Sequence, residues 1–125
     1  MSGTVVIADD DGDIRALVRI SATRAGLDVV GEHEDGDSAL ASIRREVPDI
    51  AILDVAMPGL SGLEVCRLVR AESALDGVRI LLLSASVDEP TIAAGMSAGA
   101  ADYLSKPFSP RELASRLSAY AEESR

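Results

Sequence analysis

The chain has 125 residues, which is the usual size of one domain with one hydrophobic core. It is 47% apolar but has one Phe, two Tyr and no Trp, so the core must be aliphatic and stacking of nucleic-acid bases is nearly excluded. The formal net charge of −9 disfavours direct contact with nucleic acid or an anionic membrane, and it suits a small cation or a basic partner.

The compartment follows from the same composition. Cys66 is the single cysteine, which rules out a disulfide within the chain and fits a reducing cytosol. No apolar stretch approaches the roughly 20 residues of a membrane-spanning helix. We therefore expect a cytoplasmic protein with no membrane partner.

Short apolar runs alternate with helical patterns in the first half of the chain. Thr4–Ala8 predicts a strand, and apolar residues at helical spacing follow after Gly12. Leu27–Gly31 predicts a second strand, more polar than the first and therefore at a sheet edge. Next comes His33, which we expect in an exposed loop. Apolar residues then mark a second helix, which ends at Pro48: Ala39, Leu40, Ile43 and Val47.

The second half continues the alternation. Its predicted elements are a strand over Ile50–Leu53, a helix from about Gly62 to Ala71, a strand over Arg79–Leu83, a helix over Asp88–Ala98, a strand over Ala101–Leu104 and a helix opened by a capping box at Ser109–Glu112. The helix over 88–98 is the weakest, because Gly95 interrupts it and a Gly inside a helix costs about 1 kcal/mol relative to Ala. Its expected apolar edge consists of Ile92, Ala93 and Met96.

Five strands alternating with five helices predict a (βα)5 fold. Such an order gives a doubly wound parallel sheet with helices on both faces and right-handed crossovers. With the strand order 2-1-3-4-5, the carboxyl ends of the strands meet in a crevice where the order reverses.

Asp54 marks the carboxyl end of the central strand. The four residues before it are all apolar, as in a strand covered on both faces. An isolated carboxylate inside such a sheet costs several kcal/mol, so we expect Asp54 to lie at the mouth of the sheet rather than among the buried side chains.

Four of the predicted strands are followed by polar or ionisable residues that could take part in chemistry. Asp9 and Asp10 follow the first strand, Asp54 the third, Ser84 the fourth and Lys106 the fifth. Three converging carboxylates need a proton or a cation for compensation. An all-oxygen site suits Mg²⁺, with Mn²⁺ as the second choice, whereas zinc is disfavoured because the cysteine and the histidine are isolated.

These groups together make a minimal phosphoryl-acceptor site. A carboxylate can attack a phosphoryl group and form an aspartyl phosphate. Phosphoryl transfer needs mainly positioning and neutralisation of charge, which a metal and Lys106 would supply while Ser84 donates a hydrogen bond to a phosphoryl oxygen.

The motifs at these strand ends resemble those of a known family, the receiver domain of bacterial response regulators, including the chemotaxis regulators. The matching residues are Asp9-Asp10, Leu53-Asp54 with Met57-Pro58-Gly59 and Gly62, Leu83-Ser84-Ala85, and Tyr103 with Lys106-Pro107-Phe108. The resemblance covers essentially the whole chain. It implies a flavodoxin-like fold and one receiver domain over residues 1–125, with no output domain in this chain.

The resemblance assigns roles at the metal and phosphoryl positions. It implies that Asp54 is the phosphoacceptor and that Asp10, Asp54 and the backbone carbonyl of Ala56 bind Mg²⁺. Asp9 would help through water or hydrogen bonds. Lys106 would contact the phosphoryl group. Asp11 is expected to start the first helix rather than to bind metal.

Three further roles follow from the same resemblance. Lys106 and Pro107 would be joined by a cis peptide bond. Ser84 and Tyr103 would form a switch pair, in which the hydroxyl moves toward the phosphate and the ring turns inward. Ala56 and Ser86 would flank the attacking water and tune dephosphorylation.

The implied function is a phosphorylation-controlled switch in a two-component system or phosphorelay. The donor would be a sensor histidine kinase or a histidine phosphotransfer protein. The domain would catalyse its own phosphorylation and a slow autodephosphorylation without being a conventional enzyme. It would signal through the fourth helix, fifth strand and fifth helix. Its target would be an output protein or a C-terminal output domain absent from this chain, and the resemblance allows a phosphorylation-linked homodimer.

Other readings of the site remain open at this stage. Asp9 and Asp10 could cap a helix, and Lys106 could simply pair with them in a receiver-like interaction module that does not depend on phosphorylation. A haloacid-dehalogenase-like phosphatase would carry a second Asp where this chain has Ala56. A flavodoxin would need a phosphate-binding loop after the first strand, where consecutive aspartates would repel the phosphate.

Overall fold

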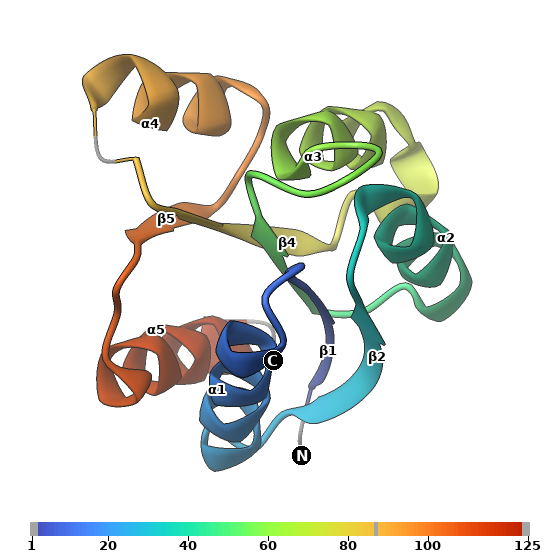
Figure 1. Ribbon diagram of the computed structural model, residues 1–125. Coiled ribbons are helices and arrows are strands. Elements are labelled where there is room, and N and C mark those ends of the chain that lie inside the picture. The colour runs from blue at the N-terminus through green and yellow to red at the C-terminus, as the bar shows by residue number, and fades with distance from the viewer. Residues whose placement is uncertain (1–2, 87, 124–125) are drawn as a thin grey trace.

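The computed structural model describes residues 3–86 and 88–123, and its centre is one sheet of five parallel strands (Figure 1). The strands are β1 (Thr4–Ala8), β2 (Asp28–His33), β3 (Ile50–Asp54), β4 (Arg79–Ser84) and β5 (Asp102–Ser105). They lie in the order β2-β1-β3-β4-β5, as the sequence predicts, and every pair of neighbours is parallel. The order reverses between β1 and β3, which is where ligands bind in sheets of this type.

Helices cover both faces of the sheet. They are α1 (Gly12–Arg24), α2 (Gly36–Glu46), α3 (Gly62–Ala71), α4 (Glu89–Ser97) and α5 (Pro110–Glu123), with a short 3₁₀ helix η1 (Ser73–Leu75) before β4. Figure 1 shows α2, α3 and α4 on one side and α1 beside α5 on the other. In the part of the chain that the structure describes, no helix combines the length and apolar character needed to cross a membrane.

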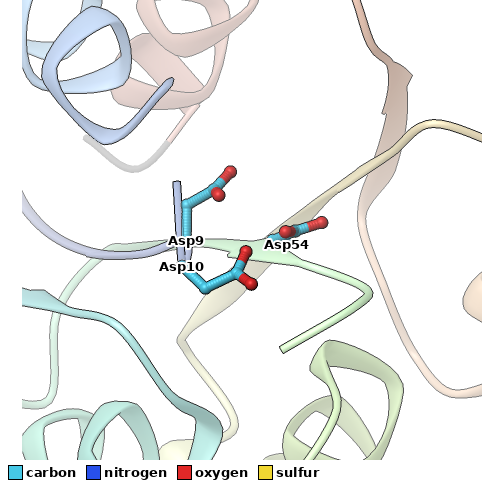
Figure 2. A group of neighbouring side chains, drawn as sticks. All are labelled: Asp9, Asp10 and Asp54. Carbon is cyan, nitrogen blue, oxygen red and sulfur yellow. The ribbon is translucent and has the colours of Figure 1, made fainter. Parts of the chain in front are cut away.

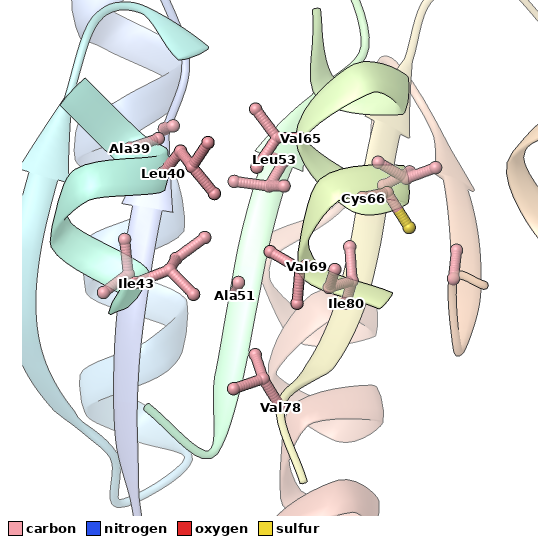
Figure 3. Packing of buried hydrophobic residues seen from close by; sticks show 14 of the residues in the cluster. Ala39, Leu40, Ile43, Ala51, Leu53, Val65, Cys66, Val69, Val78 and Ile80 are labelled. Carbon is pink, nitrogen blue, oxygen red and sulfur yellow. The ribbon is translucent and has the colours of Figure 1, made fainter. Parts of the chain in front are cut away.

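The alternation of side chains along each strand builds two hydrophobic clusters. On β3, Ala51 and Leu53 face the cluster under α2 and α3 (Figure 3), whereas Ile50 and Ile52 face the cluster under α1 and α5. All four side chains are buried, so β3 is covered on both faces as its continuous apolar run predicts. Each buried Leu or Ile contributes about 1.5–3 kcal/mol relative to an exposed one, and this rigid centre fixes the position of Asp54.

Strand β2 differs from its predicted bounds. It lies at the sheet edge as expected, but it runs to His33 instead of ending at Gly31. The prediction of an exposed loop at His33 is therefore wrong. The side chain is half-buried, its Nε2 has no hydrogen-bond partner among the described residues, and burial lowers the pKa of the imidazole.

Helix α4 also differs from expectation in the face that it buries. Gly95 is its buried residue, whereas Ala93 and Met96 of the expected apolar edge are exposed. A Cβ atom at Gly95 would lie 3.0 Å from Leu82 Cδ1 and 3.3 Å from Tyr103 Cδ2. The glycine is thus the point where α4 approaches the sheet, not merely an interruption of the helix.

Local capping explains where several helices begin. Asp11 caps α1, because its side chain accepts hydrogen bonds from the backbone N–H groups of Asp13 and Ile14. Helix α3 begins with a capping box between Ser61 and Glu64. At α5, the backbone N–H of Glu112 donates to Ser109 Oγ at 3.0 Å. Asp11 is therefore a helix-start residue, as predicted.

Candidate functional site at the carboxyl ends of the strands

Three carboxylates meet where the strand order reverses. Asp9 and Asp10 follow β1, and Asp54 is the last residue of β3. Figure 2 shows the side chains of Asp9, Asp10 and Asp54 near one another. One oxygen from each of the three carboxylates lies within 4.8 Å of the others. The sheet thus brings together the acidic residues that the sequence predicts to converge.

Asp54 is buried, which contradicts the expectation that it avoids the buried side chains. Only 5% of the residue is exposed, and Asp9 is fully buried beside it. The carboxylates are tolerated because they are not isolated. Lys106 Nζ lies 2.9 Å from Asp9 Oδ2 and 3.2 Å from Asp54 Oδ2.

The single ammonium group of Lys106 therefore forms ion pairs with two buried carboxylates. Burial raises the pKa of Asp54, the charge of Asp9 raises it further, and Lys106 only partly opposes the shift. For Lys106, burial lowers the pKa, but its contacts with Asp9 and Asp54 outweigh burial and hold the pKa above its usual value. The site keeps an excess of negative charge, which a cation would relieve.

The donor set fits a hard divalent cation. Carboxylate oxygens are the ligands that Mg²⁺ and Mn²⁺ prefer. Asp10 is exposed, so its carboxylate faces solvent at the mouth of the site. Both oxygens of Asp9 already contact the protein, since Oδ1 accepts from the Asp11 N–H at 2.9 Å and Oδ2 pairs with Lys106. That arrangement agrees with an indirect role for Asp9 at a metal.

The loop after β3 and the end of β5 frame the site. The Ala56 N–H donates to Asp54 Oδ1 at 3.3 Å, which orients the carboxylate. The Lys106 N–H donates to the Ser84 carbonyl at 2.8 Å, so β4 fixes the backbone from which the lysine side chain extends. The Lys106–Pro107 peptide bond is cis, as the resemblance implied.

Ser86 connects Ser84 with Tyr103. The Ser86 N–H donates to Ser84 Oγ at 3.0 Å, and the Tyr103 hydroxyl donates to the Ser86 carbonyl at 2.7 Å. The Ser86 hydroxyl donates to Asp88 Oδ2 at 3.0 Å, and Asp88 caps α4. The backbone and hydroxyl of Ser86 thus contact both members of the expected switch pair and the start of α4.

The sequence reasoning missed one residue beside the site. Arg15 Nη1 donates to the backbone carbonyl of Asp9 at 2.7 Å. In the sequence, Arg15 is only a basic residue off the apolar stripe of the first helix. Its position one turn after the aspartates at the helix start was the available signal.

Comparisons with known proteins agree with this geometry. The family model of the response regulator receiver domain matches residues 5–118. The DNA-binding response regulator MtrA of Mycobacterium tuberculosis is 38% identical over 121 residues, covering 95% of this chain and 50% of the relative. The alkaline phosphatase synthesis transcriptional regulatory protein PhoP of Bacillus subtilis is 37% identical over 124 residues, covering 99% of this chain and 50% of the relative.

Solved structures show the same architecture. The signal receiver domain of NarL from Mycobacterium tuberculosis superposes with a TM-score of 0.90 at 34% identity, covering 97% of each chain. The chemotaxis response regulator CheY4 of Vibrio cholerae superposes with a TM-score of 0.87 at 32% identity, covering 96% of this chain and 99% of the other.

The chain belongs to the response regulator receiver domain family. Receiver domains of this family are signalling modules of two-component systems rather than conventional enzymes. The chain spans about half the length of the curated relatives that it matches.

Proposed function

We propose that this domain is a signalling switch that accepts a phosphoryl group on Asp54 in a reaction that requires Mg²⁺. The observation that carries the proposal is the meeting of Asp54 with Asp9, Asp10 and Lys106 at one edge of the sheet. Membership of the receiver family supports it. The proposed donor is a sensor histidine kinase or a histidine phosphotransfer protein.

In the proposed reaction, an oxygen of Asp54 attacks the phosphorus of a phosphohistidine. The new P–O bond forms as the P–N bond breaks, and the leaving imidazole keeps the electron pair and takes up a proton. Bound Mg²⁺ supplies neutralisation of the phosphoryl charge. Lys106 adds a second positive charge, and Ser84 donates a hydrogen bond to a phosphoryl oxygen. Asp10 and the Ala56 carbonyl are the other proposed direct metal contacts, and Asp9 would assist through water or hydrogen bonds.

The proposed output runs through α4, β5 and α5. Ser84 and Tyr103 are its switch pair, and their shared contact with Ser86 supports this route. Ala56 and Ser86 are the proposed determinants of dephosphorylation rate, which the domain itself would catalyse slowly. The proposed targets are an output protein or an output domain beyond this chain, and a phosphorylation-linked homodimer is a further prediction. The cytoplasmic location remains a prediction from the single cysteine.

The test is an intact-mass measurement after incubation with Mg²⁺ and acetyl phosphate. We expect one phosphoryl adduct on the wild type, none after chelation of Mg²⁺ and none on Asp54→Asn. Asp49→Asn is the matched control, because Asp49 accepts a hydrogen bond from the Thr4 N–H at 2.8 Å, next to the start of β1 and away from the strand ends that carry the site. It should still form the adduct.

The opposite results would favour another function. A folded wild type that neither forms an adduct nor binds Mg²⁺ would contradict the proposal. It would instead support an interaction module in which Lys106 permanently neutralises Asp9 and Asp54.

A further inference from the structure

Arg15 reaches back from α1 to the loop that carries the acidic residues. Its Nη1 donates to the Asp9 carbonyl at 2.7 Å, and only 20% of its side chain is exposed. That carbonyl belongs to the peptide group that joins Asp9 to Asp10. The contact therefore acts on the backbone between two residues of the carboxylate cluster, not on a carboxylate itself.

The backbone of Asp9 is held from two sides. Its N–H donates to the carbonyl of His33 on β2 at 3.1 Å, and its C=O accepts from Arg15. Asp10 follows directly, is exposed and carries one of the three converging oxygens. The two hydrogen bonds fix the peptide groups on either side of the Asp9 Cα atom, so the direction in which the chain presents Asp10 is restricted.

Strand β2 and the loop that follows it in turn orient Arg15. The Nε of Arg15 lies 3.9 Å from Oε1 of Glu32 in β2, and its Nη2 lies 3.8 Å from Oε1 of Glu34 just after the strand. These long ion pairs neutralise the guanidinium without drawing it away from the carbonyl, where the donor and acceptor atoms are closest. Arg15 is thus placed by the end of an edge strand and the loop that follows it, and it acts on the loop after the neighbouring strand.

We propose that Arg15 is a positioning residue for the metal site, which holds the Asp9–Asp10 peptide so that Asp10 faces Asp54. The inference rests on the proposed function, because it assumes that the carboxylate cluster binds Mg²⁺. Groups that orient metal ligands typically change metal affinity by about 10- to 100-fold when they are removed.

Electrostatics alone predicts the opposite effect of removing Arg15 on the affinity for Mg²⁺. A cation near a cation site disfavours binding, so loss of a positive charge should strengthen Mg²⁺ affinity. Arg19 provides the matched comparison, because it lies one turn further along α1 and pairs with the same Glu32 at 3.1 Å. Within the described part of the chain Arg19 donates to the Glu32 carboxylate and not to the Asp9 carbonyl, so it separates the charge effect from the positioning effect.

The experiment titrates Mg²⁺ into wild type, Arg15→Ala, Arg15→Lys and Arg19→Ala and follows backbone amide shifts by NMR. We expect Arg15→Ala to bind Mg²⁺ about tenfold more weakly than wild type. Arg15→Lys keeps a positive charge and an N–H donor for the Asp9 carbonyl, so it should recover part of the affinity. Arg19→Ala should bind as tightly as wild type or more tightly.

Two measurements separate a specific role of Arg15 from a loss of overall stability and from a failure of the proposed function. Thermal unfolding without Mg²⁺ shows whether each variant is folded at the temperature of the titration. Wild type that binds no Mg²⁺ would overturn the proposed function itself. Wild type that binds Mg²⁺ while Arg15→Ala binds equally well or better would overturn only the role of Arg15.

Discussion

Asp102 is the residue that joins the start of β5 to α5. Its Oδ2 accepts hydrogen bonds from Arg116 Nη1 at 2.5 Å and from the Tyr120 hydroxyl at 2.7 Å, while Oδ1 accepts from the Tyr103 N–H at 2.8 Å. Burial alone would raise the pKa of Asp102, but the hydrogen bonds from Tyr120, Tyr103 and Arg116 outweigh it and lower the pKa. The carboxylate is therefore stabilised in its ionised form.

We predict that Asp102→Asn lowers the free energy of unfolding at pH 7 by about 2 kcal/mol, the usual size for hydrogen bonds to a charged group. A lowered folded-state pKa stabilises the protein above the unfolded pKa of about 3.9, and this contribution disappears as pH falls through the folded value. Urea unfolding of both proteins from pH 7 downward measures the difference, which should shrink below about pH 4. A difference that stays constant over this range would contradict the prediction.

The functional residues at strand ends could be predicted from the sequence. The residues whose contacts join two different strands or helices could not. Asp54 stands out in the sequence because it follows a continuous apolar run, and Lys106 because it follows a short predicted strand and precedes Pro107-Phe108. Arg15 and Asp102 carry no such signal, because their contacts join residues of different elements. The Arg15 side chain reaches the backbone after β1, and Asp102 is reached by side chains from α5. The burial of Asp54 was also missed, because its pairing with Lys106 depends on tertiary structure.

At the scale of elements, α4 is attached to the sheet more weakly than α1. Its one buried residue is Gly95, which contributes no side chain, whereas α1 buries Val18, Ser21 and Ala22. Local opening is easiest where few apolar contacts must be broken.

We therefore predict that backbone amides of α4 exchange with deuterium faster than those of α1, by at least about tenfold for a difference in opening free energy of about 1.4 kcal/mol. Hydrogen exchange followed by NMR on the unphosphorylated protein measures this. Helix α1 serves as the internal reference, and equal protection in the two helices would count against a weakly held α4.

The bounds of most elements follow from local signals, and the exceptions have physical causes. Helix α3 begins and ends where the sequence predicts, with the Ser61 capping box at its start. Strand β2 was predicted too short because an edge strand is half-exposed and its last residues are polar. The buried face of α4 was misassigned, because a helix that approaches the sheet through Gly95 does not present its largest apolar side chains.

For the whole molecule, charge and metal binding are linked to stability. The chain carries a net charge of −9, and its carboxylate cluster has a single ammonium partner, Lys106. A ligand that binds only the folded state stabilises it by an amount set by its concentration relative to Kd.

We predict that Mg²⁺ at ten times its Kd raises the free energy of unfolding by about 1.4 kcal/mol. NaCl at matched ionic strength is the control, because general screening of the acidic surface also stabilises the fold. Asp54→Asn should lose most of the Mg²⁺-specific part. An equal response to both salts in the wild type would show that screening accounts for the whole effect.

The parallel sheet with helices on both faces could be predicted from the alternation of strands and helices, because parallel strands need helical crossovers and these have one hand. The predicted order 2-1-3-4-5 agrees with the structure, and the convergence of Asp9, Asp10 and Asp54 follows from that order. The output target of the domain cannot be predicted from the fold in this way. The relatives named as DNA-binding or transcriptional regulators are about twice as long, and a receiver fold alone does not specify an output.

The contacts of Ser86 bear on how sharply such a domain can respond. If the Ser84 hydroxyl turns toward a phosphorylated Asp54, the Ser86 N–H loses its acceptor, and the same residue also holds Tyr103 and, through Asp88, the first turn of α4. Because these three contacts share one residue, we expect them to change together. We then expect the loop around Ser86 to adopt two discrete conformations rather than a series of intermediates. In a population in which only part of the Asp54 side chains are phosphorylated, the size of the response would equal the fraction of molecules that have switched completely.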